Sequence, residues 1–559
     1  MTASRLMLDH VFDHEQNHPD RLYLTQPLGE GRVAEYTWSQ TLDQSRRMAA
    51  HLHGLGLEPG ARIAILSKNC AHFVMAELAI WMAGGTTVAI FPTETAETVR
   101  YVLEHSGASL LFVGKLDLWE HQAAGVPAGL PCIALPLAPP TQLDSWDAVT
   151  GRTQPLTGRP QRQPNDLAMI IYTSGSTGQP KGVMHSFERV TRASEGIVAK
   201  LHRDLGPQTR NRVLSYLPLA HVFERAWVEC GSLVDGNTHL FFAEALDTFL
   251  QDLQRARPVT FISVPRLWLK FQQGVFAKMP EAKLDRLLRI PLLGRLVARK
   301  VLKGLGLDQV LLAASGSAPI PPALISWYRR LGLNLLEGYA MTEDFAYSFS
   351  SSTEHNAPGF VGVPLPGVQM RLSDEGEILI RSPGQMVGYY RRPDLDAECF
   401  TPDGFFRTGD RGELNAEGML RLTGRVKELF KTAKGKYVAP APIENRLNAH
   451  PMVELSLVSG VGQAAAYAVV LLAEHLRPLL HQAETRQQVQ TELLRLLEEV
   501  NRNLADYEQV RMIVVAPEPW TIENGMLTPT MKIRRGRIEA NFETELPRWY
   551  GSDAKIIWV

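Results

Sequence analysis

The sequence contains little cysteine and no long apolar run, and each absence excludes a class of protein. Its four cysteines, Cys70, Cys132, Cys230 and Cys399, are widely separated and form no C-x-x-C pair. We therefore expect neither a zinc cluster nor a disulfide framework, but free thiols in a reducing compartment. No stretch approaches the ~18 uninterrupted apolar residues that span a bilayer. The N-terminal residues also lack the basic and then apolar pattern of a signal peptide, so we expect a cytoplasmic protein.

The sequence has no excess of charge of either sign. Lys and Arg total 58, Asp and Glu total 59, and the net charge is −1. A near-neutral chain has no general attraction for nucleic acid or anionic lipid, so no nucleic-acid partner is expected and membrane contact would need a local patch. With 45% apolar and 21% charged residues, the 559-residue chain has a globular composition and enough length for more than one domain.

Short apolar runs alternate with amphipathic helical patterns along the chain. Residues 62–66, 86–90, 110–113 and 167–172 are typical of buried strands, and residues 71–81 have helical spacing. This alternation predicts an α/β fold whose sheets are covered by helices.

A change of pattern near Gly424 predicts a domain boundary. The residues before it are Gly-rich with short strands, whereas the roughly 130 residues after it have their own strands and a long helical pattern over 485–503. We predict a large N-terminal domain of helix-covered sheets over residues 1–424 and a small α+β C-terminal domain over residues 425–559.

A loop rich in glycine, serine and threonine follows the strand over 167–172. From Tyr172 it has the sequence Tyr-Thr-Ser-Gly-Ser-Thr-Gly-Gln-Pro-Lys-Gly-Val. Glycine lets backbone N–H groups converge on one point and the hydroxyls add donors, so this loop suits a phosphate chain. Lys181 is followed by Gly182 rather than by Ser or Thr, which disfavours a P-loop ATPase or kinase.

Five motifs in a fixed order resemble the adenylate-forming superfamily of acyl-CoA synthetases, nonribosomal peptide adenylation domains and luciferases. Besides the loop, they are Tyr339-Ala-Met-Thr-Glu, Arg407-Thr-Gly-Asp, Thr423-Gly-Arg-Val-Lys-Glu and Asn524-Gly-Met-Leu-Thr-Pro-Thr-Met-Lys-Ile-Arg-Arg. Ala340 stands where glycine is commoner in that superfamily. The segment Ser215-Tyr-Leu-Pro-Leu-Ala-His-Val-Phe-Glu-Arg and the one beginning at Pro258 look like the long-chain fatty acyl-CoA synthetase branch.

The resemblance implies a site for ATP and Mg²⁺. Tyr339 would stack on adenine, Thr342 would touch the α-phosphate, and Glu343 with Thr173 would hold the metal through oxygen ligands. Asp410 would accept hydrogen bonds from both ribose hydroxyls. The structural alternatives are a turn cap at Asp410, a core aromatic at Tyr339 and a solvated acid at Glu343. The implied nucleotide-binding residues are Thr173, Ser174, Gly175, Ser176, Thr177, Gly178, Lys181, Gly316, Ser317, Ala318, Glu337, Gly338, Tyr339, Ala340, Thr342, Asp410, Arg425 and Lys532.

The resemblance also implies that the C-terminal domain moves. Lys532, Thr342 and Glu343 are the expected catalytic residues. Of these, Lys532 would supply a cation for adenylation and then withdraw. Lys427 falls where the family has its hinge residue. After the movement, Lys434, Gly435 and Lys436 would line the path of coenzyme A, with Gly435 allowing close backbone approach.

The resemblance defines the residues that bind the acyl substrate less clearly than those that bind the nucleotide. The resemblance puts His221 near the acyl carboxylate as a substrate-side residue, although a lone histidine is as often a satisfied core residue. Arg225 falls near a position where some relatives have a gating tryptophan, and Trp227 follows two residues later. We take Trp227 as the acyl-tunnel candidate, and the departure leaves chain-length preference open.

One local patch departs from the balanced charge. Residues 283–303 contain seven basic residues and a single acid, Asp285, interleaved with leucines. This pattern suits an interfacial helix pair divided at Pro291 and Gly294, and weak peripheral contact with the inner face of a membrane. The alternative is the solvated face of a packed helical insertion.

The resemblance implies an ATP-dependent fatty acid–CoA ligase that forms acyl-AMP and then acyl-CoA. One alternative is an acyl-AMP ligase that passes its product to a carrier protein or another nucleophile. Another is an inactive acyl- or nucleotide-binding protein, which the joint presence of Thr342, Glu343, Asp410 and Lys532 disfavours.

Overall fold

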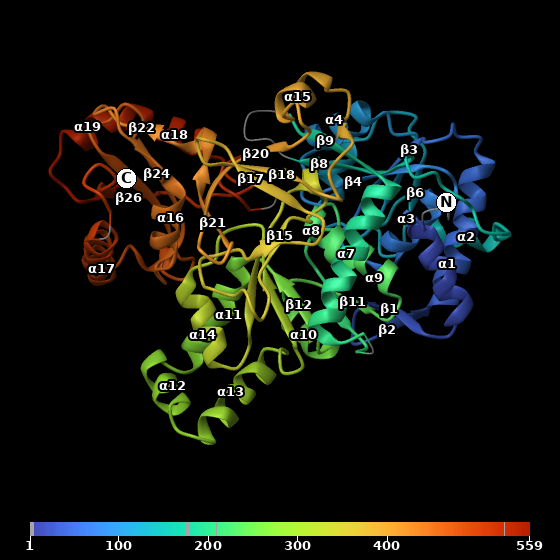
Figure 1. The fold of residues 1–559 in the computed structure, drawn as a ribbon, viewed down its shortest axis with the longest axis horizontal. Helices are drawn as coiled ribbons and strands as arrows, with labels where there is room; N and C mark the ends of the chain where they lie inside the picture. Colours follow the sequence, from blue (N-terminus) through green and yellow to red (C-terminus); the bar gives the residue numbers. More distant parts are fainter. Residues whose placement is uncertain (1–4, 174–178, 208, 503, 530) are drawn as a thin grey trace.

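The computed structural model describes residues 5–173, 179–207, 209–502, 504–529 and 531–559. They form a mixed α/β protein with a large N-terminal part and a smaller C-terminal part, drawn in orange and red in Figure 1. This confirms the predicted fold class. Within these residues, no helix has both the length and the apolarity that crossing a bilayer requires.

The largest sheet has eight strands in the order β19-β9-β8-β4-β3-β5-β6-β7. Its outer strands are β19 (Gly388–Tyr389) and β9 (Lys181–Ser186) at one edge and β6 (Cys132–Ala134) and β7 (Asp144–Ser145) at the other. Its centre consists of β8 (Leu167–Thr173), β4 (Thr86–Ile90), β3 (Arg62–Leu66) and β5 (Leu110–Val113), all parallel. Helices cover it, and α3 (Ala71–Met82) is buried along its whole length. Strands covered on both faces have no polar side, which explains why they appear in the sequence as continuous apolar runs. The predicted strand positions are confirmed.

Two further sheets complete the centre of the N-terminal part. One has the order β10 (Arg212–Ser215), β11 (His239–Phe242), β1 (Leu22–Pro27) and β2 (Val33–Thr37). The other has the order β12-β13-β14-β15-β16, which ends in the short strands β15 (Phe349–Ser350) and β16 (Val363–Pro364). In the second sheet, β12 (Thr260–Ser263), β13 (Leu312–Ser315) and β14 (Leu335–Tyr339) run parallel. The carboxyl ends of β13 and β14 therefore bring the predicted purine segments to one edge of this sheet.

A small antiparallel sheet joins the N-terminal part to the C-terminal part. Its order is β17 (Gln369–Leu372), β18 (Glu377–Arg381), β20 (Phe406–Leu414) and β21 (Leu420–Arg425), and β20 pairs with β21. Beyond it lies a sheet in the order β24 (Val453–Ser459), β25 (Ala466–Leu472), β26 (Val510–Val515) and β27 (Ile556–Trp558). This sheet is packed against α17 (Ala483–Arg502). Strand β21 runs one residue past the predicted boundary at Gly424, and the boundary itself stays a prediction.

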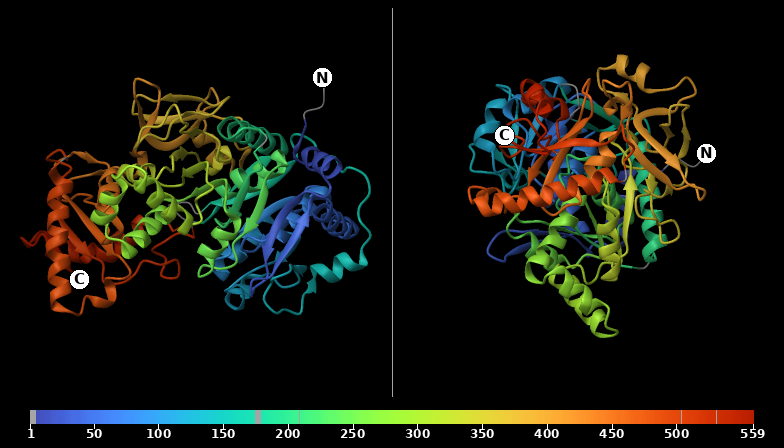
Figure 2. Two further views of the ribbon diagram at one scale, coloured as in Figure 1. Left: turned by 90° about the horizontal axis from the view of Figure 1, so that it is seen from below. Right: turned by 90° about the vertical axis from the view of Figure 1, so that its left-hand side faces the viewer.

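The basic segment forms the helical hairpin α12 (Glu281–Leu288) and α13 (Leu293–Gly304), which projects from the body at the bottom of Figure 1 and again in the right-hand view of Figure 2. The predicted division at Pro291 is confirmed. The division at Gly294 is wrong, because Gly294 lies inside α13. A Cβ atom there would lie 2.4 Å from the carbonyl oxygen of Leu288, so glycine allows the two helices to meet closely.

Candidate active site

The predicted phosphate loop lies between two paired strands. Strand β8 ends at Thr173 and β9 (Lys181–Ser186) begins at Lys181, and these two residues face each other in the antiparallel register. Directly opposed residues in such a pair have Cα atoms roughly 4.5–5.5 Å apart. The expected phosphate and metal ligand Thr173 therefore adjoins the expected phosphate ligand Lys181. Ser174, Gly175, Ser176, Thr177 and Gly178 lie outside the described residues.

Tyr389 connects Lys181 to Glu343. The Lys181 Nζ atom lies 5.5 Å from the centroid of the Tyr389 ring, and the Tyr389 hydroxyl donates a 2.7 Å hydrogen bond to Glu343 Oε1. The neighbouring Glu343 carboxylate raises the pKa of Tyr389, although burial is the larger cause. Glu343 and Lys181 thus lie on the same side of the molecule as Thr173, an arrangement suited to a metal-bound triphosphate.

The donor chemistry here fits Mg²⁺. Glu343 offers a carboxylate and Thr173 a hydroxyl, both hard oxygen ligands of the kind Mg²⁺ prefers. Among the described residues, no group of three or more His, Cys, Asp or Glu side chains forms a metal site of its own. A Mg²⁺ ion held by these residues would take its other ligands from phosphate oxygens and water.

Thr342 and Glu343 lie on a tight 3-10 turn, Thr342–Asp344, that buried side chains hold in place. His185 of β9 hydrogen-bonds the Thr342 carbonyl oxygen at 2.9 Å, and burial lowers the pKa of this histidine to about 4, so it donates as a neutral ring. Asp344 accepts from the backbone N–H groups of Met341 and Tyr347. Burial raises the pKa of Asp344 to about 8. The turn is therefore fixed from both sides.

Tyr339, Asp410 and Arg425 form a connected group. The Tyr339 hydroxyl donates a 2.7 Å bond to Asp410 Oδ2, and Arg425 Nε lies 3.0 Å from Asp410 Oδ1. Asp410 and Arg425 also face each other in the β20–β21 register. Both carboxylate oxygens keep a second lone pair, so binding of two ribose hydroxyls by Asp410 remains geometrically feasible and stays a prediction, as does stacking by Tyr339.

The predicted purine segments adjoin the acyl side. A Cβ atom at Gly316 would lie 3.2 Å from the ring of Phe223, so glycine permits close contact with the segment that carries His221. Ser317 has a φ of 67°, and Ala318 follows it. Glu337 accepts a 3.2 Å bond from the Gly359 N–H, and burial raises its pKa to about 7. Gly338 and Ala340 flank Tyr339 at the end of β14.

Lys532 reaches this group from the C-terminal part. It lies on a tight loop in which the Thr528 N–H donates to the Lys532 carbonyl oxygen at 2.8 Å. Surrounding protein lowers the pKa of Lys532, and the Arg425 guanidinium acts in the same direction. Asp410, Glu428 and Glu343 act in the opposite direction. Lys532 is exposed and forms no ion pair with these carboxylates among the described residues, so they act on its ammonium group from beyond ion-pair distance.

His221 faces the same cation. Burial, together with the nearby Lys532 ammonium, lowers the pKa of His221 to about 3. The Phe223 N–H donates to His221 Nδ1 at 3.2 Å. A neutral imidazole that accepts at Nδ1 carries its proton on Nε2. His221 is therefore suited to donate a hydrogen bond to a carboxylate and unsuited to act as a base.

Buried polar side chains hold the loop that leads to His221. Asn69 donates to the carbonyl oxygen of Leu217 at 2.7 Å and accepts from the Leu219 N–H at 3.0 Å. Glu224 accepts from Ser215 Oγ at 2.7 Å and from the Tyr216 N–H at 3.1 Å. Each backbone group bonded in this way loses freedom to move, so His221 is presented on a rigid loop.

Arg225 belongs to this support. Its guanidinium is 1% exposed, donates to the Leu219 carbonyl oxygen at 2.8 Å and forms ion pairs with the buried carboxylates of Glu77 and Glu229. Arg225 is thus held as part of the core, and the position of the acyl gate stays open. Trp227, half-buried, instead donates from Nε1 to the Ala346 carbonyl oxygen at 2.9 Å. It thereby links the π-helix Arg225–Cys230 to the turn after Glu343.

The residues expected on the coenzyme A side lie at the tip of a hairpin. Lys434, Gly435 and Lys436 are exposed between β22 (Phe430–Lys431) and β23 (Tyr437–Val438), and Gly435 has a φ of 77°. Lys427, the expected hinge, lies in the 3-10 turn Val426–Glu428 directly after β21. In this orientation of the C-terminal part, the charges of Arg425, Asp410 and Glu343 act on Lys532.

One ion pair connects the two parts in this orientation. Arg266 of α11 (Pro265–Lys278) bonds to Glu454 of β24 (Val453–Ser459), and Arg477 lies 2.6 Å from the other oxygen of Glu454. Glu454 is partly buried, so the pair is shielded from solvent better than an exposed one.

Comparison with known proteins assigns the family. A family model described as AMP-binding enzyme matches residues 11–390, and another described as AMP-binding enzyme C-terminal domain matches residues 428–554. The chain belongs to the AMP-binding enzymes. Long-chain-fatty-acid–CoA ligase FadD15 of Mycobacterium bovis is 30% identical to it, over 97% of this chain and 96% of that protein. Human long-chain-fatty-acid–CoA ligase 1 is 28% identical, over 89% of this chain and 80% of that protein. The predicted resemblance is confirmed.

Solved structures of AMP-binding enzymes share the fold. The A domain of carboxylic acid reductase from Segniliparus rugosus, in complex with AMP and a carboxylic acid, superimposes with a TM-score of 0.80 at 23% identity, covering 98% of this chain and 94% of that one. The anthranilate CoA ligase AuaEII, in complex with anthranoyl-AMP, gives a TM-score of 0.77 at 20% identity, covering 98% and 99%. At these identities the likeness concerns the fold.

Several residues of this site gave no signal in the sequence. Asn69, His185 and Tyr389 lie outside the motifs, and only the fold brings them to the His221 loop, to Thr342 and to Glu343. Asp344 follows Glu343 directly, and its burial was not evident from the pattern. Arg225 was noticed only as a tunnel position.

Proposed function

We propose that this AMP-binding enzyme is an ATP-dependent fatty acid–CoA ligase. In its first step a fatty acid carboxylate attacks the α-phosphorus of ATP, giving acyl-AMP and pyrophosphate. In the second step the thiol of coenzyme A attacks the acyl carbonyl and AMP leaves. The observation that carries the proposal is the hydrogen-bonded group of Tyr339, Asp410 and Arg425, whose Asp410 and Arg425 charges also act on Lys532.

In the first step the protein orients two anions that repel each other. His221 donates from Nε2 to one carboxylate oxygen, and Lys532 lies between the acyl side and the nucleotide side, where it offsets charge as the phosphorus is attacked. Thr342 and Lys181 bind phosphate oxygens. Mg²⁺, held by Glu343 and Thr173, would supply charge neutralisation for the pyrophosphate that leaves.

In the second step the C-terminal domain turns about Lys427 and withdraws Lys532. The exposed hairpin that carries Lys434, Gly435 and Lys436 then meets the N-terminal domain and forms the path of the coenzyme A thiol. A domain boundary at residues 424/425 is consistent with this movement, because the short 3-10 turn after β21 is where backbone torsions can change without disrupting a core.

The acid is of the long-chain class. Support comes from the names of the relatives, which are long-chain-fatty-acid–CoA ligases over nearly the full length of this chain. We place the enzyme in the cytoplasm, in weak peripheral contact with the inner face of the membrane, since long acyl chains are held there.

Exchange of labelled pyrophosphate into ATP tests the proposal. The exchange should require both Mg²⁺ and a fatty acid, and coenzyme A should convert the bound adenylate to acyl-CoA with release of AMP. Exchange without thioester formation, but with transfer to a carrier protein, would favour the acyl-AMP ligase alternative. A lack of exchange with every chain length from short to long would refute the proposal.

A further inference from the structure

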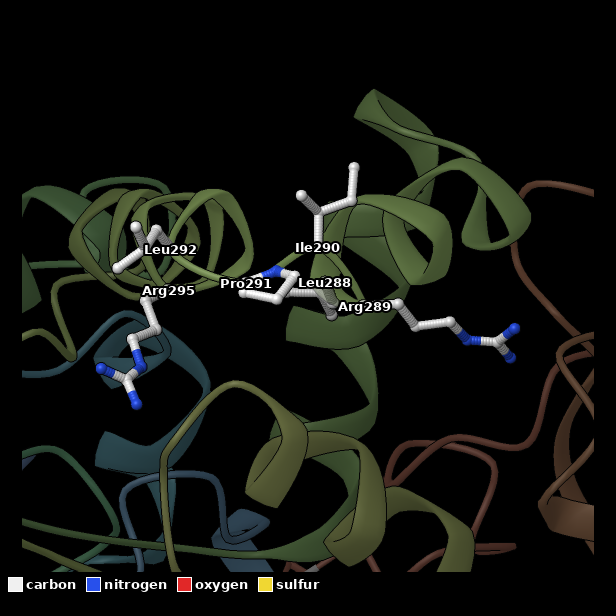
Figure 3. Close-up of a pocket in the computed structure, with 6 residues that line it drawn as sticks. All are labelled: Leu288, Arg289, Ile290, Pro291, Leu292 and Arg295. Carbon is white, nitrogen blue, oxygen red and sulfur yellow. The ribbon is translucent and has the colours of Figure 1, made fainter.

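The tip of the α12–α13 hairpin exposes apolar side chains to solvent. We call Ile290, Leu292, Leu293 and Leu296 the apolar tip; their exposed fractions are 46%, 74%, 41% and 66%. Four large exposed apolar residues within seven positions are denser than the single exposed apolar residues that are normal on a protein surface. Two of them, Ile290 and Leu292, line a hollow of about 280 Å³ (Figure 3), together with Leu288, Arg289, Pro291 and Arg295.

The other apolar residues of the hairpin are packed against the protein. Leu284 and Ala298 are buried in the core that contains Trp268 and Trp327, and Val297 and Leu302 are partly buried against it. The hairpin therefore has a base fixed to the body and a tip with no such packing. The amphipathic pattern of the base is explained by the fold, whereas that of the apolar tip is not.

Leu292 is held in a strained conformation. Its φ is 64° and its ψ is −52°, and the Leu293 N–H bonds to the Pro291 carbonyl oxygen at 2.8 Å. This is the γ-turn that is rare because its central residue is strained. A glycine would adopt it freely, yet the position holds the most exposed leucine of the tip. Backbone strain of this kind concentrates at sites of function.

Cations lie along both helices of the hairpin, and two of them, Arg289 and Arg295, lie beside the tip. We call Lys283, Arg286, Arg289, Arg295, Arg299, Lys300 and Lys303 the basic rim; all seven are exposed. Within the described part of the chain none of them forms an ion pair, and the single acid among them, Asp285, pairs with Arg330 at 3.0 Å. Figure 3 shows Arg289 and Arg295 extending to opposite sides of the apolar tip.

We propose that the apolar tip and the basic rim dock this enzyme on the surface of an anionic lipid bilayer. The leucines and isoleucine would enter the boundary between headgroups and acyl chains, and the rim would meet the anionic headgroups. Exposed cations that form no ion pair within the described part of the chain complement such a surface. A second copy of the chain is a poorer occupant, because it would bring an equal set of cations against these.

The benefit of docking to the enzyme rests on the proposed function. Long-chain acids partition into membranes, so a ligase docked there receives them without their crossing water. The interaction itself is independent of catalysis, because it is measured on the whole protein without ATP or substrate. A failed docking test therefore leaves the ligase proposal intact, and a failed activity test leaves docking intact.

Co-sedimentation with vesicles is the test. The probe is a set of vesicles of phosphatidylcholine with 30–40 mol% phosphatidylglycerol, compared with pure phosphatidylcholine, at low and high salt. A cation near an anionic surface strengthens binding about fivefold, so charge reversal at Arg295, Arg299 and Lys300 should lower binding at least about tenfold. Binding of the parent protein should also fall at high salt as the Debye length shortens.

Two variants separate docking from structure. The matched charge control reverses Arg32, Arg210 and Lys555, three exposed cations elsewhere, and should bind vesicles as the parent does. Leu292→Gly removes both the side chain and the strain at φ 64°. It should reduce vesicle binding several-fold while the melting temperature stays the same or rises. A lower melting temperature with unchanged binding would mean that Leu292 is structural and would overturn the proposal.

Other occupants have their own outcomes. Dimerisation of the parent without lipid, abolished by the double variant Leu292→Ser and Leu296→Ser, would assign the tip to contact between copies and overturn the proposal. If the triple charge reversal at Arg295, Arg299 and Lys300 and the control triple reversal lose vesicle binding equally, the binding depends on net charge alone. That result would also overturn the proposal. The supporting result is loss confined to tip and rim variants, with a higher apparent KM for vesicle-borne acid and unchanged turnover on a soluble short-chain acid.

Discussion

Replacing Lys532 with alanine separates the two half-reactions most sharply. Surrounding protein and the Arg425 guanidinium lower the pKa of Lys532, and the Asp410 and Glu343 carboxylates act on it in the opposite direction. Removing one preorganised charge-stabilising group from such a site costs roughly 2.7–4 kcal/mol of transition-state stabilisation. At about 1.36 kcal/mol per factor of ten, adenylation should slow by roughly 10²–10³-fold.

The assay measures each half-reaction separately. Pyrophosphate exchange reports adenylation, and formation of acyl-CoA from supplied acyl-adenylate reports the thioester step. Lys532→Ala should lose the first and keep the second, and the exposed Lys555→Ala on the same domain should keep both. Because the pKa of Lys532 is lowered, its cation is lost as pH rises through that value. Adenylation should therefore decline on the alkaline side, and Lys532→Arg should move the decline to higher pH, since arginine stays charged. Equal losses in both half-reactions would show that Lys532 is structural.

Four further predictions concern the support of the site. Glu343→Gln should raise the Mg²⁺ concentration needed for half-maximal exchange, because an amide is a poorer ligand than a carboxylate; an unchanged titration removes Glu343 from the metal site. Arg225→Met leaves the buried carboxylates of Glu77 and Glu229 unpaired and should lower the free energy of unfolding by about 3–5 kcal/mol, whereas Arg225→Lys should fold and raise KM for the fatty acid more than KM for ATP. Arg266→Ala breaks the ion pair with Glu454 and should slow adenylation about two- to fivefold without slowing the thioester step; an equal effect on both steps contradicts a role in orienting the domain. Burial lowers the pKa of His185 to about 4, so the unfolded chain binds a proton that the folded chain does not between pH 6.5 and 4. Stability should fall as pH falls through that range, by up to about 1.4 kcal/mol per pH unit from this residue, and the difference between parent and His185→Gln, measured by denaturant unfolding, should narrow toward pH 4.

The sequence predicts the parts of this fold that are encoded locally. Strands β3, β4, β5 and β8 are buried on both faces, so their apolar runs could be recognised without the structure. The motifs likewise predicted Thr342, Glu343, Asp410 and Lys532 as site residues, and their roles stay a prediction.

What the sequence could not predict depends on distant contacts. Asn69 and Glu224 bond the same short loop from positions 155 residues apart, and nothing in either local pattern indicates this. The burial of Arg225 became visible only when Glu77 and Glu229 were placed beside it. Gly294 was expected to help divide the helices, but it lies inside α13. Its role in letting the two helices approach closely depends on how they pack, which the local sequence does not indicate.

Direct detection of the product tests the central claim most simply. The purified protein is incubated with palmitate, ATP, Mg²⁺ and coenzyme A, and the products are measured by mass spectrometry. The account predicts palmitoyl-CoA and AMP in equal amounts, both lost in Lys532→Ala. Release of ADP and phosphate, or AMP release with no acyl-CoA formed from any acid of short to long chain, would contradict it.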